Sequence, residues 1–166
     1  RIDDLVLLAT MDEGRPLRRR AVDLGALVGR EVPAVAPGAS LSLAAGVEVQ
    51  ADPDLVARAV RNLAANASRH AATRVAAAVE VDGDRAWVHL DDDGPGIPPA
   101  QRASAFARFG RLDEARSADR GGAGLGLAIV ASVAAAHDGG TDVGDAPLGG
   151  ARVSLWLPAE GQPGFE

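Results

Sequence analysis

Apolar residues recur at helical spacing over one long segment of the chain, from Asp52 to His70. Asp is a favourable N-cap and Pro is a favourable first helical residue, so Asp52-Pro53 predicts the start of a helix that ends near His70. One face of this helix is apolar and is expected to pack on a sheet. That face consists of Leu55, Ala59, Leu63 and Ala67.

The remaining elements predicted by the pattern are shorter. Strand-like runs cover residues 41–43, 47–50, 74–81, 85–91, 141–143 and 153–157. Helical spacing predicts helices over 1–9, 24–30, 101–106 and 124–136. Turns are expected near Gly46, at 82–84 and at 147–150. The charged segment 12–20 contains Gly14 and Pro16, which is typical of a linker.

Composition limits the classes of function. The 166 residues are enough for one domain with a core, and the hydrophobic fraction of 47% is ordinary for a folded protein. A net charge of -6 argues against a nucleic-acid partner. The absence of cysteine excludes disulfides and thiolate metal sites. The longest apolar run, residues 123–136, is too short to span a bilayer and no signal peptide is apparent, so we expect a cytoplasmic domain.

Candidate chemistry begins on the long helix. Asn62 and Asn66 are four residues apart and therefore share a face, which Arg69 and His70 continue one turn later. An amide oxygen can ligate Mg²⁺, and an arginine beside it can neutralise phosphate charge. The alternative is a polar helix face that is merely solvated.

A glycine-rich segment, Asp92-Asp93-Gly94-Pro95-Gly96-Ile97, follows an apolar strand. The Asp92 carboxylate only accepts hydrogen bonds, so it suits the exocyclic amino group of adenine and disfavours guanine. Gly94 and Gly96 allow the backbone to approach a base closely. The alternative is a polar turn. The residues alone do not choose among Asp91, Asp92 and Asp93.

A second glycine-rich segment, residues 121–127, lies about thirty residues further on, at the expected start of a helix. Gly122, Gly124 and Gly126 would let helix N-terminal amides surround phosphates, although tight helix–sheet packing also favours glycine. The side chains of Leu125 and Leu127 are expected in the core.

Between the two glycine-rich segments lies Phe106-Ala107-Arg108-Phe109-Gly110-Arg111. Arg111 is a candidate phosphate contact, because guanidinium pairs well with phosphate oxygens, and the alternative is a solvated arginine. The polar residues 112–121 are expected to form a lid that orders on nucleotide binding.

In this order, the segments resemble the N box, first glycine box, F box and second glycine box of the catalytic ATP-binding domain of sensor histidine kinases. The resemblance covers roughly residues 21–160. It implies the α+β Bergerat fold, a two-layer α/β sandwich in which a mixed, mostly antiparallel sheet packs on about three helices with an ATP lid. The implied ATP-binding residues are Asn62, Asn66, Arg69, His70, Asp92, Gly94, Gly96, Ile97, Arg111, Gly122, Gly124, Leu125, Gly126 and Leu127.

The resemblance also implies roles and partners. Asn66 would be the main Mg²⁺ ligand with Asn62 assisting, Asp92 would read adenine, and Arg111 would join the two asparagines in catalysis. Residues 1–20 would be the end of a dimerisation and phosphoacceptor helix plus linker, and residues 161–166 a tail. The activity would be a protein-histidine kinase that passes phosphate to a response regulator. The full-length protein would be a membrane-anchored homodimer, and this chain alone a monomer.

Position 62 separates this chain from other members of the superfamily. Gyrase-type ATPases and anti-sigma-factor serine kinases typically have Glu as a general base there, whereas Asn62 cannot take a proton. The three histidines lack the surroundings of a phosphoacceptor, so the acceptor histidine is expected in a missing domain. Ala123, Asp138 and Ala151 stand where relatives often have Thr, Gly and Thr. Two alternatives stay open: an anti-sigma-factor serine kinase, and a degenerate nucleotide sensor that transfers nothing.

Overall fold

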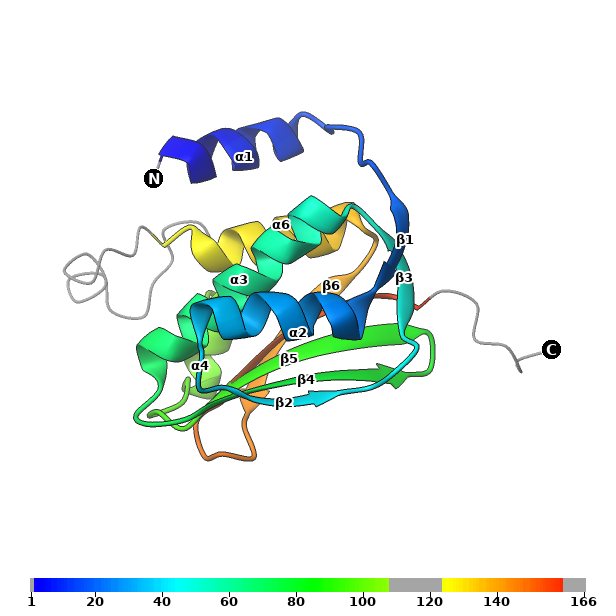
Figure 1. Ribbon diagram of the computed structural model, residues 1–166. Coiled ribbons are helices and arrows are strands. Elements are labelled where there is room, and N and C mark those ends of the chain that lie inside the picture. Colours follow the sequence, from blue (N-terminus) through cyan, green and yellow to red (C-terminus); the bar gives the residue numbers. More distant parts are fainter. Residues whose placement is uncertain (1, 108–123, 160–166) are drawn as a thin grey trace.

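The computed structural model describes residues 2–107 and 124–159 (Figure 1). The helices in these ranges are α1 (Ile2–Asp12), α2 (Leu24–Val35), α3 (Pro53–His70), α4 (Pro99–Arg102) and α6 (Gly126–Ala136). The strands are β1 (Arg20–Asp23), β2 (Ser40–Leu43), β3 (Glu48–Ala51), β4 (Val75–Asp82), β5 (Arg85–Asp92), β6 (Gly140–Asp145) and β7 (Ala151–Pro158). No helix of the described ranges combines the length and the apolar character needed to cross a membrane.

Five strands form the main sheet in the order β2-β4-β5-β7-β6. β2 runs parallel to β4, and the other neighbours are antiparallel. β1 and β3 pair separately as a two-stranded ribbon. Helices α2, α3 and α6 cover one face of the main sheet (Figure 1). The predicted α+β fold, a two-layer sandwich with a mixed, mostly antiparallel sheet, is confirmed.

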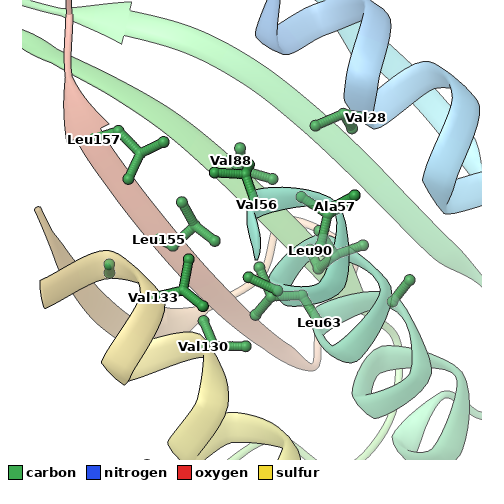
Figure 2. Packing of buried hydrophobic residues seen from close by; sticks show 14 of the residues in the cluster. Val28, Val56, Ala57, Leu63, Val88, Leu90, Val130, Val133, Leu155 and Leu157 are labelled. Carbon is green, nitrogen blue, oxygen red and sulfur yellow. The ribbon is translucent and has the colours of Figure 1, made fainter. Parts of the chain in front are cut away.

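The core lies between this sheet and the helices. Alternate residues of β5 and β7, such as Val88 and Leu155, face inward because side chains alternate along a strand. They meet the apolar face of α3 and the nearly continuous apolar surface of α6, represented by Leu63 and Val133 (Figure 2). Burying each such side chain stabilises the fold by about 1.5–3 kcal/mol. This packing fixes α3 and α6 side by side over β5 and β7.

The segments before α3 differ from their predictions. The strands expected at 41–43 and 47–50 exist, but they belong to different sheets, because β2 joins β4 and β3 pairs with β1. Strand β1 starts at Arg20, within the segment read as linker. Its pairing with residues some thirty positions away leaves no local pattern, which is why the sequence did not reveal it. Leu7 and Leu8 of α1 are buried, and α1 packs on α6.

Helices α2, α4 and α6 have bounds other than those predicted, and α1 ends at Asp12 rather than at residue 9. The helix expected at 101–106 is the shorter α4, which begins at Pro99 because proline suits a first helical turn. Helix α6 begins at Gly126 rather than 124. Helix α2 continues to Val35 through Pro33, since Val32 is completely buried in the core.

Candidate functional site

The C-terminal half of α3, the end of β5 and the start of β7 surround one cavity. Helix α3 starts at Pro53 behind its N-cap Asp52, whose side chain accepts hydrogen bonds from the backbone of Asp54 and Leu55, and its last two turns reach this place. The cavity is lined by Asn66, His70, Asp92, Pro95, Gly96, Ile97 and Ala151. Five residues predicted from separate motifs therefore meet here: Asn66, His70, Asp92, Gly96 and Ile97.

Asn66 is buried, with 5% of its surface exposed, and its side-chain amide makes no hydrogen bond to any described residue. Burying an amide without a partner is unfavourable, and such groups are rare in folded proteins unless a ligand or water completes them. One turn earlier, Asn62 donates from Nδ2 to the carbonyl oxygen of Gly126 at 3.3 Å. Asn62 thus joins α3 to the first residue of α6, while Asn66 presents an amide to the cavity.

The three consecutive aspartates have different surroundings. Asp91 forms a bidentate ion pair with Arg152, with N–O distances of 2.7 and 2.8 Å, and this hydrogen bonding raises the pKa of Arg152. Asp93 accepts hydrogen bonds from the segment after α3. Only Asp92 lines the cavity. The role of Asp92 toward a nucleotide stays a prediction.

Asp92 is held in place by the backbone around it. Its side chain is 1% exposed, and its Oδ1 accepts from the backbone N–H of Gly94 at 2.9 Å and of Ala151 at 3.2 Å. The N–H of Gly150 donates to its main-chain oxygen at 3.1 Å. Its side-chain hydrogen bonds to described residues all use Oδ1. The second oxygen, Oδ2, is therefore the acceptor that this carboxylate can offer to a ligand.

Two glycines are required by close approach. A Cβ on Gly150 would lie 2.2 Å from Oδ1 of Asp92, and a Cβ on Gly94 would lie 1.9 Å from the carbonyl oxygen of His70. Gly94 thus brings the first glycine box against the end of α3. Gly150 was missed by the sequence reading, which interpreted residues 147–150 as a turn. The only feature of the sequence that could have pointed to this close approach was the Gly149-Gly150 pair.

The second glycine box is described only in part. Gly124 has a φ of +75°, which favours glycine, and Gly126 begins α6. Leu125 is 1% exposed and Leu127 packs against the core, so both side chains lie in the core as expected. Arg69 is exposed at the end of α3. Arg111, Gly122 and the predicted lid lie outside the described residues, so their assignments stay predictions.

Comparison with known proteins places this geometry in context. The family of histidine kinase-, DNA gyrase B- and HSP90-like ATPases matches residues 51–161. The chain is 42% identical over 107 residues to the sensor histidine kinase CpxA of Escherichia coli (strain K12), an alignment that covers 64% of this chain and 23% of CpxA. The chain therefore spans less than a quarter of that relative.

Solved structures agree with the sequence comparison. The ATP-binding domain of PrrB from Mycobacterium tuberculosis superimposes with a TM-score of 0.68 at 31% identity, covering 86% of this chain and 98% of that one. Full-length ShkA in complex with AMPPNP gives a TM-score of 0.80 at 28% identity, covering 95% of this chain and 35% of ShkA.

Proposed function

The chain belongs to the family of histidine kinase-, DNA gyrase B- and HSP90-like ATPases, and from this we propose that it is the catalytic ATP-binding domain of a sensor histidine kinase. The observation that carries the proposal is the single cavity that joins the buried amide of Asn66 to the buried carboxylate of Asp92. These two groups suit opposite ends of ATP. The similarity to sensor histidine kinases and the AMPPNP complex of ShkA support the same assignment.

Asp92 forms the adenine end of the proposed site. Its Oδ1 is occupied by two backbone N–H groups, which fix the plane of the carboxylate. Oδ2 then accepts a hydrogen bond from the exocyclic amino group of adenine. Guanine carries a carbonyl at that position, and two acceptors facing each other would repel. The site should therefore distinguish ATP from GTP.

Asn66 and Asn62 form the metal end of the proposed site. Amide oxygens fit Mg²⁺, which takes few protein ligands and completes its shell with waters and phosphates. The buried amide of Asn66, which has no partner among the described residues, is suited to this use. Bound there, Mg²⁺ supplies charge neutralisation to the phosphates. Arg69, His70 and Arg111 are proposed to add contacts to the phosphates.

The proposed reaction transfers the γ-phosphate to a histidine outside this chain. Asn62 cannot act as a base, so the domain contributes by positioning ATP and neutralising charge, and it should hydrolyse ATP poorly alone. The proposed partners are the phosphoacceptor domain of the same protein and a response regulator. We place the domain in the cytoplasm, where ATP is available, as part of a membrane-anchored homodimer.

A phosphotransfer assay tests the proposal. The chain is mixed with the separately produced phosphoacceptor domain of its own full-length protein and radiolabelled ATP. We expect an acid-labile phosphohistidine on that domain, and loss of most of the rate in Asn66→Ala. An unchanged rate in Asn66→Ala would refute the metal role. An acid-stable phosphoserine on a partner would support the anti-sigma-factor kinase, and ATP binding without transfer would support the degenerate sensor.

A further inference from the structure

Asp93 gathers four hydrogen bonds from three consecutive residues. Its Oδ1 accepts from the backbone N–H groups of Ala72, Thr73 and Arg74, each at 2.9 Å, and its Oδ2 accepts from the hydroxyl of Thr73. These residues form the connection between the end of α3 and the start of β4. One carboxylate thus holds three of the four residues of this connection.

This connection adjoins both walls of the cavity. On one side it continues from the last turn of α3, which carries Asn66 and His70. On the other side, Asp93 follows Asp92 directly, and Gly94 approaches the carbonyl of His70 so closely that no side chain fits between them. A shift of Asp93 would therefore move the adenine end of the cavity relative to α3.

We propose that Asp93 is a positioning residue for nucleotide binding, which sets the placement of Asp92 relative to the C-terminal turn of α3. The proposal rests on the proposed function, because it concerns the same site. Asp93 does not line the cavity, so the proposed role needs no direct contact with the nucleotide. Asp93 affects binding by holding the end of α3 and the segment that begins with Asp92 in a fixed relative position.

We call the four hydrogen bonds from residues 72–74 to Asp93 the clamp. The clamp depends on the charge of the carboxylate and not on its shape alone. In all four hydrogen bonds Asp93 is the acceptor. These hydrogen bonds, first the one from the Arg74 backbone and then those from Thr73, lower the pKa of Asp93 far below its ordinary value. An asparagine has the same size, but its one acceptor oxygen is neutral and accepts more weakly from the three N–H groups, and the hydroxyl of Thr73 has to turn from donor to acceptor to meet its NH₂ group. Asp93→Asn should therefore weaken the clamp without creating a cavity.

Asp91 provides a matched control. It is two residues away, its carboxylate accepts two hydrogen bonds from Arg152, and neither Asp91 nor Arg152 lines the cavity. Asp91→Asn neutralises a carboxylate in the same way two residues earlier and breaks the ion pair with Arg152. It separates a loss of general stability from a loss of positioning.

The experiment measures ATP affinity by calorimetry, with Mg²⁺, in wild type, Asp93→Asn, Asp91→Asn, Asp92→Asn and the double variant Asp92→Asn/Asp93→Asn. Thermal unfolding without nucleotide is recorded for each. We expect Asp93→Asn to weaken ATP binding about tenfold, because hydrogen bonds to a neutral oxygen are weaker than those to a carboxylate, and Asp91→Asn to change it less than about twofold. In the Asp92→Asn background, Asp93→Asn should cost much less, because positioning through Asp92 is non-additive.

Equal affinities for Asp93→Asn and Asp91→Asn, or additive losses in the double variant, would overturn the proposal. If Asp93→Asn fails to fold, Thr73→Val removes one of the four hydrogen bonds and should shift affinity in the same direction by a smaller factor. No change in affinity for Thr73→Val would then contradict the positioning role. A folded wild type that binds no ATP would refute the proposed function itself, together with this inference.

Discussion

The two ends of helix α3 carry buried polar residues of nearly the same exposure but different hydrogen bonding. The linker end consists of Asp52, 5% exposed, and His137, 1% exposed. The cavity end consists of Asn66, 5% exposed, and Asp92, 1% exposed. Burial alone therefore does not distinguish the two ends.

At the linker end the polar atoms satisfy one another. Asp52 donates its backbone N–H to Nε2 of His137 at 3.0 Å, and Nδ1 of His137 donates to the Val133 carbonyl at 2.7 Å. The Asp52 carboxylate accepts from the backbone of Asp54 and Leu55, and also from Arg18 in the linker. This arrangement joins the linker to α3 and α6, and it is complete without a ligand.

At the cavity end the hydrogen bonding within the described residues is incomplete. The Asn66 amide makes none, and Asp92 uses one carboxylate oxygen. Buried polar groups that lack protein partners need a ligand, a water or an ion. This difference in hydrogen bonding, rather than in burial, is the reason that we assign a structural role to the linker end and propose the cavity end as the binding site.

The largest expected effect is a loss of stability when the linker end of α3 is changed. Asp52→Ala removes the N-cap of α3 and leaves the backbone N–H of Arg18 without its acceptor, so the free energy of unfolding should fall by about 3 kcal/mol. ATP affinity of the folded protein should change less than about twofold. Urea denaturation and calorimetry measure the two quantities. Asp52→Asn, which retains an acceptor oxygen, is the control and should lose less stability; a large loss of affinity with little loss of stability would reverse our assignment of the two ends.

The second expected effect is a dependence of the free energy of unfolding on pH, caused by His137. Burial lowers the pKa of His137, since the charged form is disfavoured in the core, although Asp52 and Asp138 oppose this and Arg19 adds to it. A histidine whose pKa is lower when folded is protonated more readily when unfolded, so its stabilisation is complete above the ordinary value of 6.5 and declines as the pH falls below it. The slope is at most about 1.4 kcal/mol per pH unit.

Unfolding measured between pH 7.5 and about 5 checks this prediction. His137→Gln should flatten the slope, because glutamine does not titrate in this range. The same slope in the variant would mean that other groups produce it.

The smallest expected effect concerns the residue after His137. Asp138 has a φ of +62°, a backbone conformation that favours glycine, and its carboxylate lies 3.6 Å from Arg19 of the linker. Asp138→Gly should relieve backbone strain and lose a weak exposed ion pair, so the free energy of unfolding should rise by less than about 1 kcal/mol. Thermal unfolding measures it. A clear loss of stability would show that the ion pair outweighs the strain.

The sequence predicted those parts of the molecule that depend on local pattern. The Asp52-Pro53 start of α3, the strand-like run that became β5 and the spacing of Asn62 and Asn66 are visible in neighbouring residues, and the order of the boxes implied the two-layer fold. The pairing of β1 with β3 was not predicted, because it joins distant segments without a local signal. The clamp made by Asp93 was missed for a similar reason, since its partners, residues 72–74, are identified only once α3 and β5 are packed together.

The most direct test of the account compares ATP with GTP on wild type and Asp92→Asn by calorimetric titration with Mg²⁺. Asparagine can keep the acceptor at Oδ1 for Gly94 and Ala151, but it replaces Oδ2 by an NH₂ group that cannot accept from adenine. We predict that wild type binds ATP and not GTP, and that Asp92→Asn loses at least about tenfold in ATP affinity with little change in unfolding. Equal binding of ATP and GTP, or an unchanged ATP affinity in Asp92→Asn, would contradict the assignment of the cavity end as the nucleotide site.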